Sequence, residues 1–299
     1  MITILPETTK DPISLIGRRA GICWGADITD NEKNYKRGLD CIKANHGRTW
    51  EFVNVEMVLD GYSARVIREW YTHIGGSPTR LQASTRYIDY SDFDYVTPDS
   101  IRTNEEKITV NTGLHLEDLS VKRIYELAMN DVKIALERLE KCGIPKEDLA
   151  NLLPLGMTTK VVDKRNLRSL VDMSHQRMCN RAYDEYRQLF RDVINALRKV
   201  SDEWSMVIDL LFCPKCDMLG YCPETYSCGR KPKKETEDSV QKWITNHPVP
   251  NKGVDFHVCP NCREEFSYDA ETGISMSKYK FCPNCGSILN GTTHDNNRL

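Results

Sequence analysis

The stretch Thr72–Tyr87, THIGGSPTRLQASTRY, carries most of the information in this sequence. It follows a segment of helical periodicity that ends at Tyr71, and Gly75, Gly76 and Pro78 end that helix. Histidine, arginine and hydroxyl side chains are concentrated there beside aromatic residues. Backbone amides and arginines bind phosphate, and forked side chains bind the edges of rings. The stretch therefore predicts a binding site for a planar, phosphorylated ligand.

The end of this stretch, Ser84–Tyr87, combines two hydroxyl side chains with an arginine and a tyrosine. On an extended segment Ser84 and Arg86 would point to the same side and could bind one anion. Thr85 and Tyr87 would then face the protein. Arg80 precedes them, close to a Gly-Gly turn where a ligand can approach the backbone. For any single one of these residues, a polar surface loop is the alternative interpretation.

A second polar segment begins at 153–159, LPLGMTT, and continues through Asn166 and Arg168 to Arg177. Its Gly- and Pro-containing turn lies beside an apolar helical pattern, as in the first stretch. The two segments together predict one site that binds phosphate and ring edges.

Hydrophobic spacing predicts most of the regular structure. Residues 53–59 are apolar and β-branched enough for a buried strand or the start of a helix. Helices are expected at 31–44, 63–71, 119–141, 145–153, 166–178 and, as one continuous element, 181–211.

Composition excludes several classes of protein. The 299 residues suffice for one large domain with a small appendage, and a net charge of −2 gives no reason to expect a nucleic-acid partner. No apolar run reaches the roughly 18 residues of a membrane span, and the N-terminus lacks a signal-peptide pattern. We therefore expect no membrane contact and a cytoplasmic location.

Four of the 12 cysteines form two Cys-x-x-Cys pairs separated by 19 residues. This spacing is typical of a zinc ribbon, in which each turn presents two thiolates to one tetrahedral metal ion. Two reduced, unmetallated motifs are the alternative. The expected structural zinc ligands are Cys259, Cys262, Cys282 and Cys285.

The other cysteines give weaker signals. One group has irregular spacing, so a second metal site, free thiols and a redox-sensitive pair stay open: Cys213, Cys216, Cys222 and Cys228. The isolated cysteines are expected to be small buried hydrophobes: Cys23, Cys41, Cys142 and Cys179. The composition changes at Cys213, and the predicted organisation is a main domain at 1–212, a Cys-containing extension and linker at 213–252, a zinc ribbon at 253–290 and a disordered tail at 291–299. Trp243 and Ile244 predict one short helix within the linker.

Several motifs resemble those of the flavin-dependent thymidylate synthases, and the resemblance covers about residues 45–230. That family's signature is Arg-His-Arg, seven residues, Ser and then Arg-Tyr, and here 72–74 precede 84–87 by nine residues. Residues 61–70 resemble the family's Gly-Val-Ser-Arg…Gln-Trp helix, and 150–154 resemble Ala-Arg-x-x-Leu-Pro. Residues 166–170 match Asn-x-Arg-x-Leu, and Arg177 matches the arginine that precedes Ala-x-x-Glu at 182–185.

The chain departs from the family pattern mainly by losing cations. Thr72 and Ile74 replace both arginines of Arg-His-Arg, and Asn151 replaces the arginine of the later motif. Other changes are Glu69 for Gln, Gln82 for Glu, and Phe52 for a histidine near the flavin. Because lost cations weaken phosphate binding, Arg80 in the two-residue insertion is the expected substitute.

The resemblance implies an α+β fold, with helices packed on a mixed or antiparallel sheet, and a homotetramer whose sites combine several subunits. It implies reductive methylation of dUMP to dTMP with bound FAD, using methylenetetrahydrofolate and NAD(P)H, here NADPH, as co-substrates. No cysteine attacks the pyrimidine in this family, in agreement with the lack of a nucleophile motif that a conventional thymidylate synthase would need.

The resemblance also implies roles for individual residues. Arg177 would be the catalytic residue, because a fixed guanidinium favours the deprotonated ring nitrogen of uracil. The substrate-binding positions are Glu69, Thr72, Arg80, Gln82, Ser84, Thr85, Arg86 and Asn151. The cofactor-binding positions are Asn54, His73, Ile74, Asn166, Arg168 and Asp172. The alternatives are a related flavoenzyme, such as a pyrimidine-nucleotide hydroxymethylase, and a zinc-ribbon protein that binds nucleic acid or another protein.

Overall fold

The chain divides into two compact units, Met1–Lys231 and Pro232–Leu299. The computed structural model describes residues 1–111 and 116–233 and, beyond them, only the strands of the second unit named below. Within these described residues, no helix is both long and apolar enough to cross a membrane.

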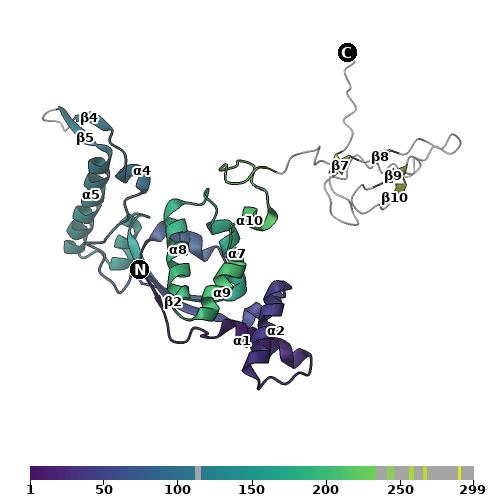
Figure 1. Ribbon diagram of the computed structural model, residues 1–299. Helices are drawn as coiled ribbons and strands as arrows, with labels where there is room; N and C mark the ends of the chain where they lie inside the picture. The colour runs from purple at the N-terminus through teal and green to yellow at the C-terminus, as the bar shows by residue number, and fades with distance from the viewer. Residues whose placement is uncertain are drawn as a thin grey trace, which may run out of the picture. The chain divides into compact units, whose positions relative to one another are not determined.

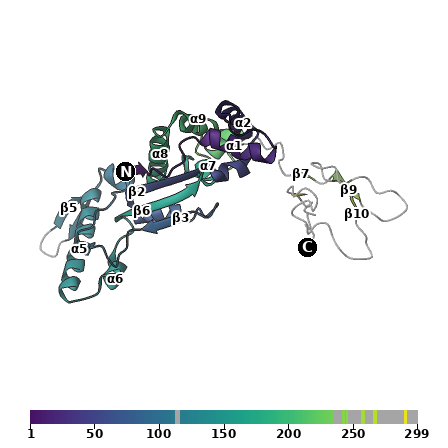
Figure 2. The same cartoon turned by 90° about the horizontal axis from the view of Figure 1, so that it is seen from below.

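The first unit is built on an antiparallel sheet with the strand order β1-β2-β6-β3, and Figure 2 shows β2, β6 and β3 side by side. Its strands are β1 (Ile2–Ile4), β2 (Asn54–Ser63), β6 (Thr158–Asn166) and β3 (Thr79–Gln82). β2 confirms the strand that 53–59 predicted, and β6 was not predicted. The register pairs Asn54 with Asn166, so two expected cofactor-binding positions lie at one end of the two central strands.

Alternation along β2 sets the two faces of the sheet. Val55, Met57 and Leu59 are fully buried on one face. On the other face, Lys160 pairs with Asp60 at 2.8 Å and Lys164 with Glu56 at 2.9 Å. The ion pairs allow that face to stay in water, while the apolar face receives the helices.

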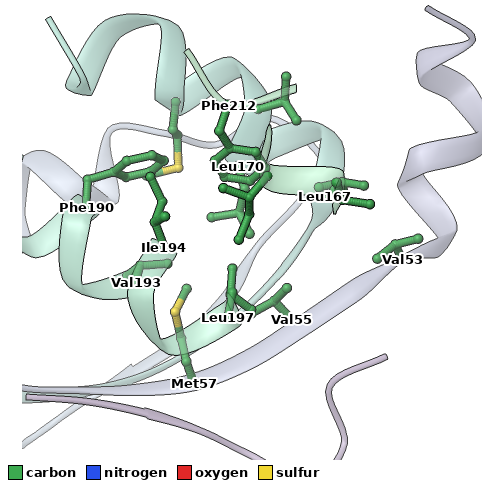
Figure 3. Packing of buried hydrophobic residues seen from close by; sticks show 14 of the residues in the cluster. Val53, Val55, Met57, Leu167, Leu170, Phe190, Val193, Ile194, Leu197 and Phe212 are labelled. Carbon is green, nitrogen blue, oxygen red and sulfur yellow. The ribbon is translucent and has the colours of Figure 1, made fainter. Parts of the chain in front are cut away.

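Three helices cover the apolar face of this sheet (Figure 2). They are α7 (Leu167–Arg177), α8 (Asp184–Arg198) and α9 (Asp202–Leu211). Their side chains, among them Leu170, Val193 and Leu197, point down onto Val55 and Met57 (Figure 3). The expected helix at 166–178 is confirmed. The single helix expected at 181–211 is wrong, because the chain breaks at 199–201 and Ser201 caps α9 by accepting from the Trp204 amide at 3.2 Å.

A capping interaction couples two of the family-like motifs. Helix α3 (Ala64–Tyr71) starts at Ser63, whose hydroxyl accepts from the Val66 amide at 3.2 Å. Glu185 accepts from both the amide and the hydroxyl of Ser63, each at 2.6 Å. The glutamate of the later motif therefore fixes the start of the helix that leads to the predicted site.

The N-terminal helices α1 (Pro12–Cys23) and α2 (Asn31–Lys43) pack closely on each other at one end of the sheet (Figure 1). A Cβ at Gly17 would lie 1.8 Å from the Asn34 carbonyl oxygen, and one at Gly38 would lie 1.9 Å from that of Ile13. Only glycine permits this approach. Helix α1 was not predicted, because glycines at this spacing indicate a loop when they are considered without their packing partner.

The opposite end of the sheet carries a helical arm (Figure 2). Its main element is α5 (Val121–Lys141), capped by Ser120 and preceded by the antiparallel strands β4 (Lys107–Asn111) and β5 (Leu116–Ser120). The remaining elements of the first unit are η1 (Gly47–Phe52), α4 (Asp99–Arg102), α6 (Lys146–Leu149), η2 (Ala150–Leu152) and α10 (Lys215–Leu219). The expected helices at 31–44, 63–71, 119–141 and 145–153 are confirmed, with the last one divided into α6 and η2.

The second unit is described only through its strands. β9 (Phe256–Val258) pairs antiparallel with β10 (Glu265–Ser267) and with β8 (Ile244–Thr245), and β7 (Gln241–Lys242) pairs with β11 (Leu289–Asn290). The short helix expected around Trp243 and Ile244 is wrong, since β7 and β8 occupy this stretch. The four expected zinc ligands, Cys259, Cys262, Cys282 and Cys285, and the tail at 291–299 lie outside the described residues.

Gly38→Ala tests the packing of α1 on α2. Inside a helix this change normally stabilises by about 0.5–1 kcal/mol. Here the added methyl would overlap the Ile13 carbonyl, so we expect the free energy of unfolding to fall by about 1–3 kcal/mol in denaturant titrations. Gly47→Ala is the control, because its Cβ would have 3.7 Å to its closest neighbour. Equal stability of the two variants would contradict the packing argument.

Candidate active site

A polar hollow of about 230 Å³ lies where β6 passes into α7. Asn166 caps α7 by accepting from the Ser169 amide at 2.9 Å, so the strand–helix junction fixes its side chain. Three of the expected cofactor-binding residues, Asn166, Arg168 and Asp172, line this hollow together. Asn54 is the cross-strand neighbour of Asn166 but does not belong to the lining.

The Gly75-Gly76 turn forms the opposite wall of the hollow. Gly76 has a φ of +74°, and a Cβ there would lie 2.3 Å from the Asn166 Nδ2. Glycine is therefore required at this position for both its backbone conformation and its contact. Ile74, expected to contact the cofactor, precedes the turn with an exposed side chain.

Glu51 is a lining residue that the sequence analysis did not select. Its carboxylate accepts from Arg168 Nη1 at 2.7 Å and from Arg48 Nη1 at 3.2 Å. These two hydrogen bonds, the one from Arg168 first, lower the pKa of Glu51. Its neighbour Phe52 occupies the family's histidine position, and that alignment was the available signal for Glu51.

The expected catalytic residue, Arg177, is the last residue of α7 and lies against the end of α3. Its Nε donates to the His73 Nε2 at 3.0 Å, and its Nη1 is 3.4 Å from the Glu69 carboxylate. The guanidinium also stacks on the ring of Tyr186 at 4.3 Å. The structure thus unites Arg177, His73 and Glu69 from two separate motifs, and it adds Tyr186, which the sequence analysis did not select.

His73 is held in its neutral form. Burial, followed by the positive charges of Arg177 and Arg165, lowers its pKa from 6.5 to about 4. A neutral imidazole can accept at Nε2, as the contact with Arg177 requires. His73 therefore orients Arg177 while the imidazole stays neutral and the guanidinium keeps its positive charge.

A buried ion pair, formed by Asp163 and Arg165, adjoins this cluster. Arg165 binds the Asp163 carboxylate through Nε at 2.6 Å and Nη2 at 2.7 Å, and both side chains are fully buried. Trp70 donates to the same carboxylate at 2.9 Å, and the Arg165 guanidinium lies 4.3 Å from its ring centre. In the sequence, Asp163 and Arg165 are only two opposite charges separated by one residue, and this pattern gave no indication of a buried ion pair.

The expected phosphate segment differs from its prediction. Residues 85–87 form a turn rather than an extended strand, because the Ser84 hydroxyl accepts from the Arg86 amide at 3.2 Å. Tyr87 is 82% exposed instead of facing the protein. Arg86 makes an ion pair with Glu147 at 2.9 Å. The expectation that Ser84 and Arg86 lie on one side of an extended segment is therefore wrong.

Most of the remaining residues expected to bind the substrate make hydrogen bonds to residues close to them. Arg80 lies in β3, donates to the Tyr71 carbonyl at 2.8 Å and stacks on the Tyr71 ring. Gln82 donates to Thr159 at 3.2 Å, and Asn151 donates to the Asp148 carbonyl at 2.9 Å. Thr72 donates to the Glu69 carbonyl and Thr85 lines a small hollow beside α6. None of these residues lines the hollow at α7.

The cysteines of the first unit are free thiols. Within the described residues, no three histidine, cysteine or carboxylate side chains are grouped to hold a metal ion, so the open possibility of a second metal site at 213–228 gains no support. Cys41 is buried as expected, whereas Cys23 and Cys142 are exposed, so the expectation of burial is wrong for these two.

Comparisons with known proteins show the family of this chain. Residues 4–201 match the family model described as "Thymidylate synthase complementing protein". The flavin-dependent thymidylate synthase of Nitratidesulfovibrio vulgaris is 28% identical over 246 residues, covering 76% of this chain and 94% of the relative. That of Pyrococcus furiosus is 26% identical over 248 residues, covering 78% and 95%.

Solved structures show the same fold. The flavin-dependent thymidylate synthase ThyX of Helicobacter pylori, complexed with FAD and dUMP, has a TM-score of 0.51 at 18% identity and covers 70% of this chain and 99% of its own. The expected α+β fold and the expected class, a methyl-transferring enzyme, are thereby confirmed. This chain belongs to the family of thymidylate synthase complementing proteins, whose curated relatives are flavin-dependent thymidylate synthases.

Proposed function

We propose that this protein converts dUMP to dTMP by reductive methylation, with FAD as its cofactor, methylenetetrahydrofolate as the carbon donor and NADPH as the reductant. The observation that carries the proposal is the contact between Arg177 and a neutral His73 beside the hollow at α7. The H. pylori relative, which was crystallised with FAD and dUMP, supports the choice of ligands.

The hollow at α7 fits the polar edge of a flavin. Its lining contains two carboxylates, Glu51 and Asp172, and one guanidinium, that of Arg168. The hollow therefore favours ligands that donate hydrogen bonds. A flavin ring offers an N–H, and its ribityl chain offers hydroxyls. Gly76 leaves room for close approach, and the exposed Ile74 provides an apolar surface beside the turn for a flat ring. FAD bound there would supply the reducing equivalents for the reaction.

Arg177 would activate the pyrimidine. Its Nε and Nη1 are engaged by His73 and Glu69, and its Nη2 makes no hydrogen bond within the described residues. A guanidinium fixed beside an imide stabilises the deprotonated ring nitrogen electrostatically. The Glu69 contact is long, at 3.4 Å, so it compensates only part of that positive charge.

The phosphate-binding residues would join this site through assembly. Arg86 and Asn151 lie near α6 and Arg177 lies at the end of α7, and the two groups share no lining residue. A homotetramer whose sites combine subunits, which the family resemblance implies, would bring one chain's Ser84–Arg86 turn to another chain's Arg177. Within the described residues Arg80 makes no hydrogen bond through Nε or Nη2, so both could bind a phosphate, and its role in replacing the lost cations stays a prediction.

The first prediction concerns FAD. The purified protein should bind FAD, as measured by quenching of flavin fluorescence, and Gly76→Ala should weaken that binding about tenfold or more, because its methyl would displace Asn166. Gly25→Ala is the matched control. Gly25 also has a positive φ, +61°, but has open space around it. Absence of binding at tens of micromolar FAD would refute the flavoenzyme proposal. An equal loss of FAD affinity in both variants would show that FAD does not bind in the hollow at α7.

The second prediction concerns Arg177→Lys. Lysine keeps the charge but cannot donate to His73 and to a ring edge in one plane. We expect dTMP formation to fall well over tenfold, the factor that about 1.4 kcal/mol of barrier represents, while FAD binding is retained. Turnover within about threefold of wild type would show that another residue activates the pyrimidine.

A further inference from the structure

A second and larger cavity, of about 420 Å³, lies at the Arg177 end of α7. One wall is the end of α7 and the loop that follows it, and the other wall is the extension 214–231. The extension follows the end of the family match at residue 201. The cavity is therefore built in part from sequence that the family model does not cover.

The extension is held in place by specific contacts. His175 Nδ1 lies 3.0 Å from the Cys213 carbonyl oxygen, and Arg181 Nη1 donates to the Tyr226 carbonyl at 2.6 Å. The Arg181 guanidinium also lies 5.4 Å from the centre of the Tyr226 ring. At its far end, Arg230 pairs with Asp217 within the extension itself. These bonds give the cavity a defined wall rather than a loose loop.

The cavity carries an excess of positive charge. Five cationic side chains line it: Arg177, Arg181, Lys215, Arg230 and Lys231. The carboxylates that oppose them are Glu224 in the lining, Glu69 on Arg177, and Asp217 on Arg230 and Lys231. Five cations against three carboxylates leave two positive charges, which matches the charge of a phosphate monoester.

Two of the cations are available to a ligand. Lys215 makes no ion pair within the described residues, and Arg181 is bonded only to a carbonyl and an aromatic ring there. Gln176 and Asn180 add neutral polar groups to the same lining. Arginine and lysine with free donors are the side chains that bind phosphate oxygens in proteins.

We propose that this cavity binds a phosphate monoester, through Lys215 and Arg181, of a nucleotide whose other end reaches Arg177. The proposal rests on the proposed function, which supplies the source of that group, the 2′-phosphate of NADPH, and assigns the phosphate of dUMP to the Ser84–Arg86 turn of another subunit.

The test is calorimetric titration of the full-length protein with inorganic phosphate, dUMP, deoxyuridine, NADPH and NADH. Lys215→Gln should weaken the binding of inorganic phosphate and of NADPH about three- to tenfold, while Lys215→Arg retains their binding. Lys199→Gln is the matched control. It removes one charge at the end of α8 remote from the cavity, about 22 Å along the helix from Asp184.

The pattern of losses identifies the ligand. A loss for NADPH but not for NADH supports the proposal, and a loss for dUMP but not for deoxyuridine would overturn it by assigning the cavity to the substrate. Unchanged binding of phosphate, dUMP and NADPH in Lys215→Gln would overturn the proposal, as would equal losses for ligands with and without the phosphate. A wild-type protein that forms no dTMP would refute the proposed function instead, and the phosphate titration would still be interpretable.

Discussion

The ion pair between Asp163 and Arg165 is the constraint on which the arrangement of the site depends. Both side chains are fully buried, and removing one partner of such a pair typically costs about 3–5 kcal/mol, because an uncompensated charge remains inside the protein. The pair also binds Trp70 of α3 through the Asp163 carboxylate, and Arg165 reaches Met173 of α7. Strand β6 and the two helices are therefore held in one relative position.

This constraint explains the electrostatics around Arg177. Trp70 fixes the end of α3, and His73 follows this helix. Helix α7 ends at Arg177, whose Nε lies 3.0 Å from the His73 Nε2. Two guanidinium groups and burial keep the imidazole neutral, so that it accepts a hydrogen bond and leaves the charge on Arg177. The same arginine lines the cationic cavity of the extension, so its positive charge is available to ligands that bind there.

Residues that signal through local pattern were predictable, and residues that act through distant partners were not. The Ser63 cap and the periodic apolar face of α5 are local signals, and helices α3 and α5 were therefore predictable from the sequence. The helix around Gly17 was not predicted, because the residues of α2 that pack on this glycine are remote in sequence. Asn166 and Arg168 were predicted through motif order, whereas Tyr186 and Asp163 act only through tertiary contacts that one sequence does not display. The turn at Ser84 replaced the expected extended segment because a side-chain hydrogen bond closed it.

The protonation state of His73 tests the central claim most directly. Its ring resonances, assigned by comparison with His73→Gln, can be followed by NMR while the pH is lowered. Burial and the charges of Arg177 and Arg165 predict a midpoint near the pKa of about 4, so the signals should stay constant from pH 8 to about pH 5.5. A midpoint near the ordinary histidine value of about 6.5 would show that the imidazole is exposed to solvent and does not accept from Arg177. The buried ion pair would then not govern the geometry of the site.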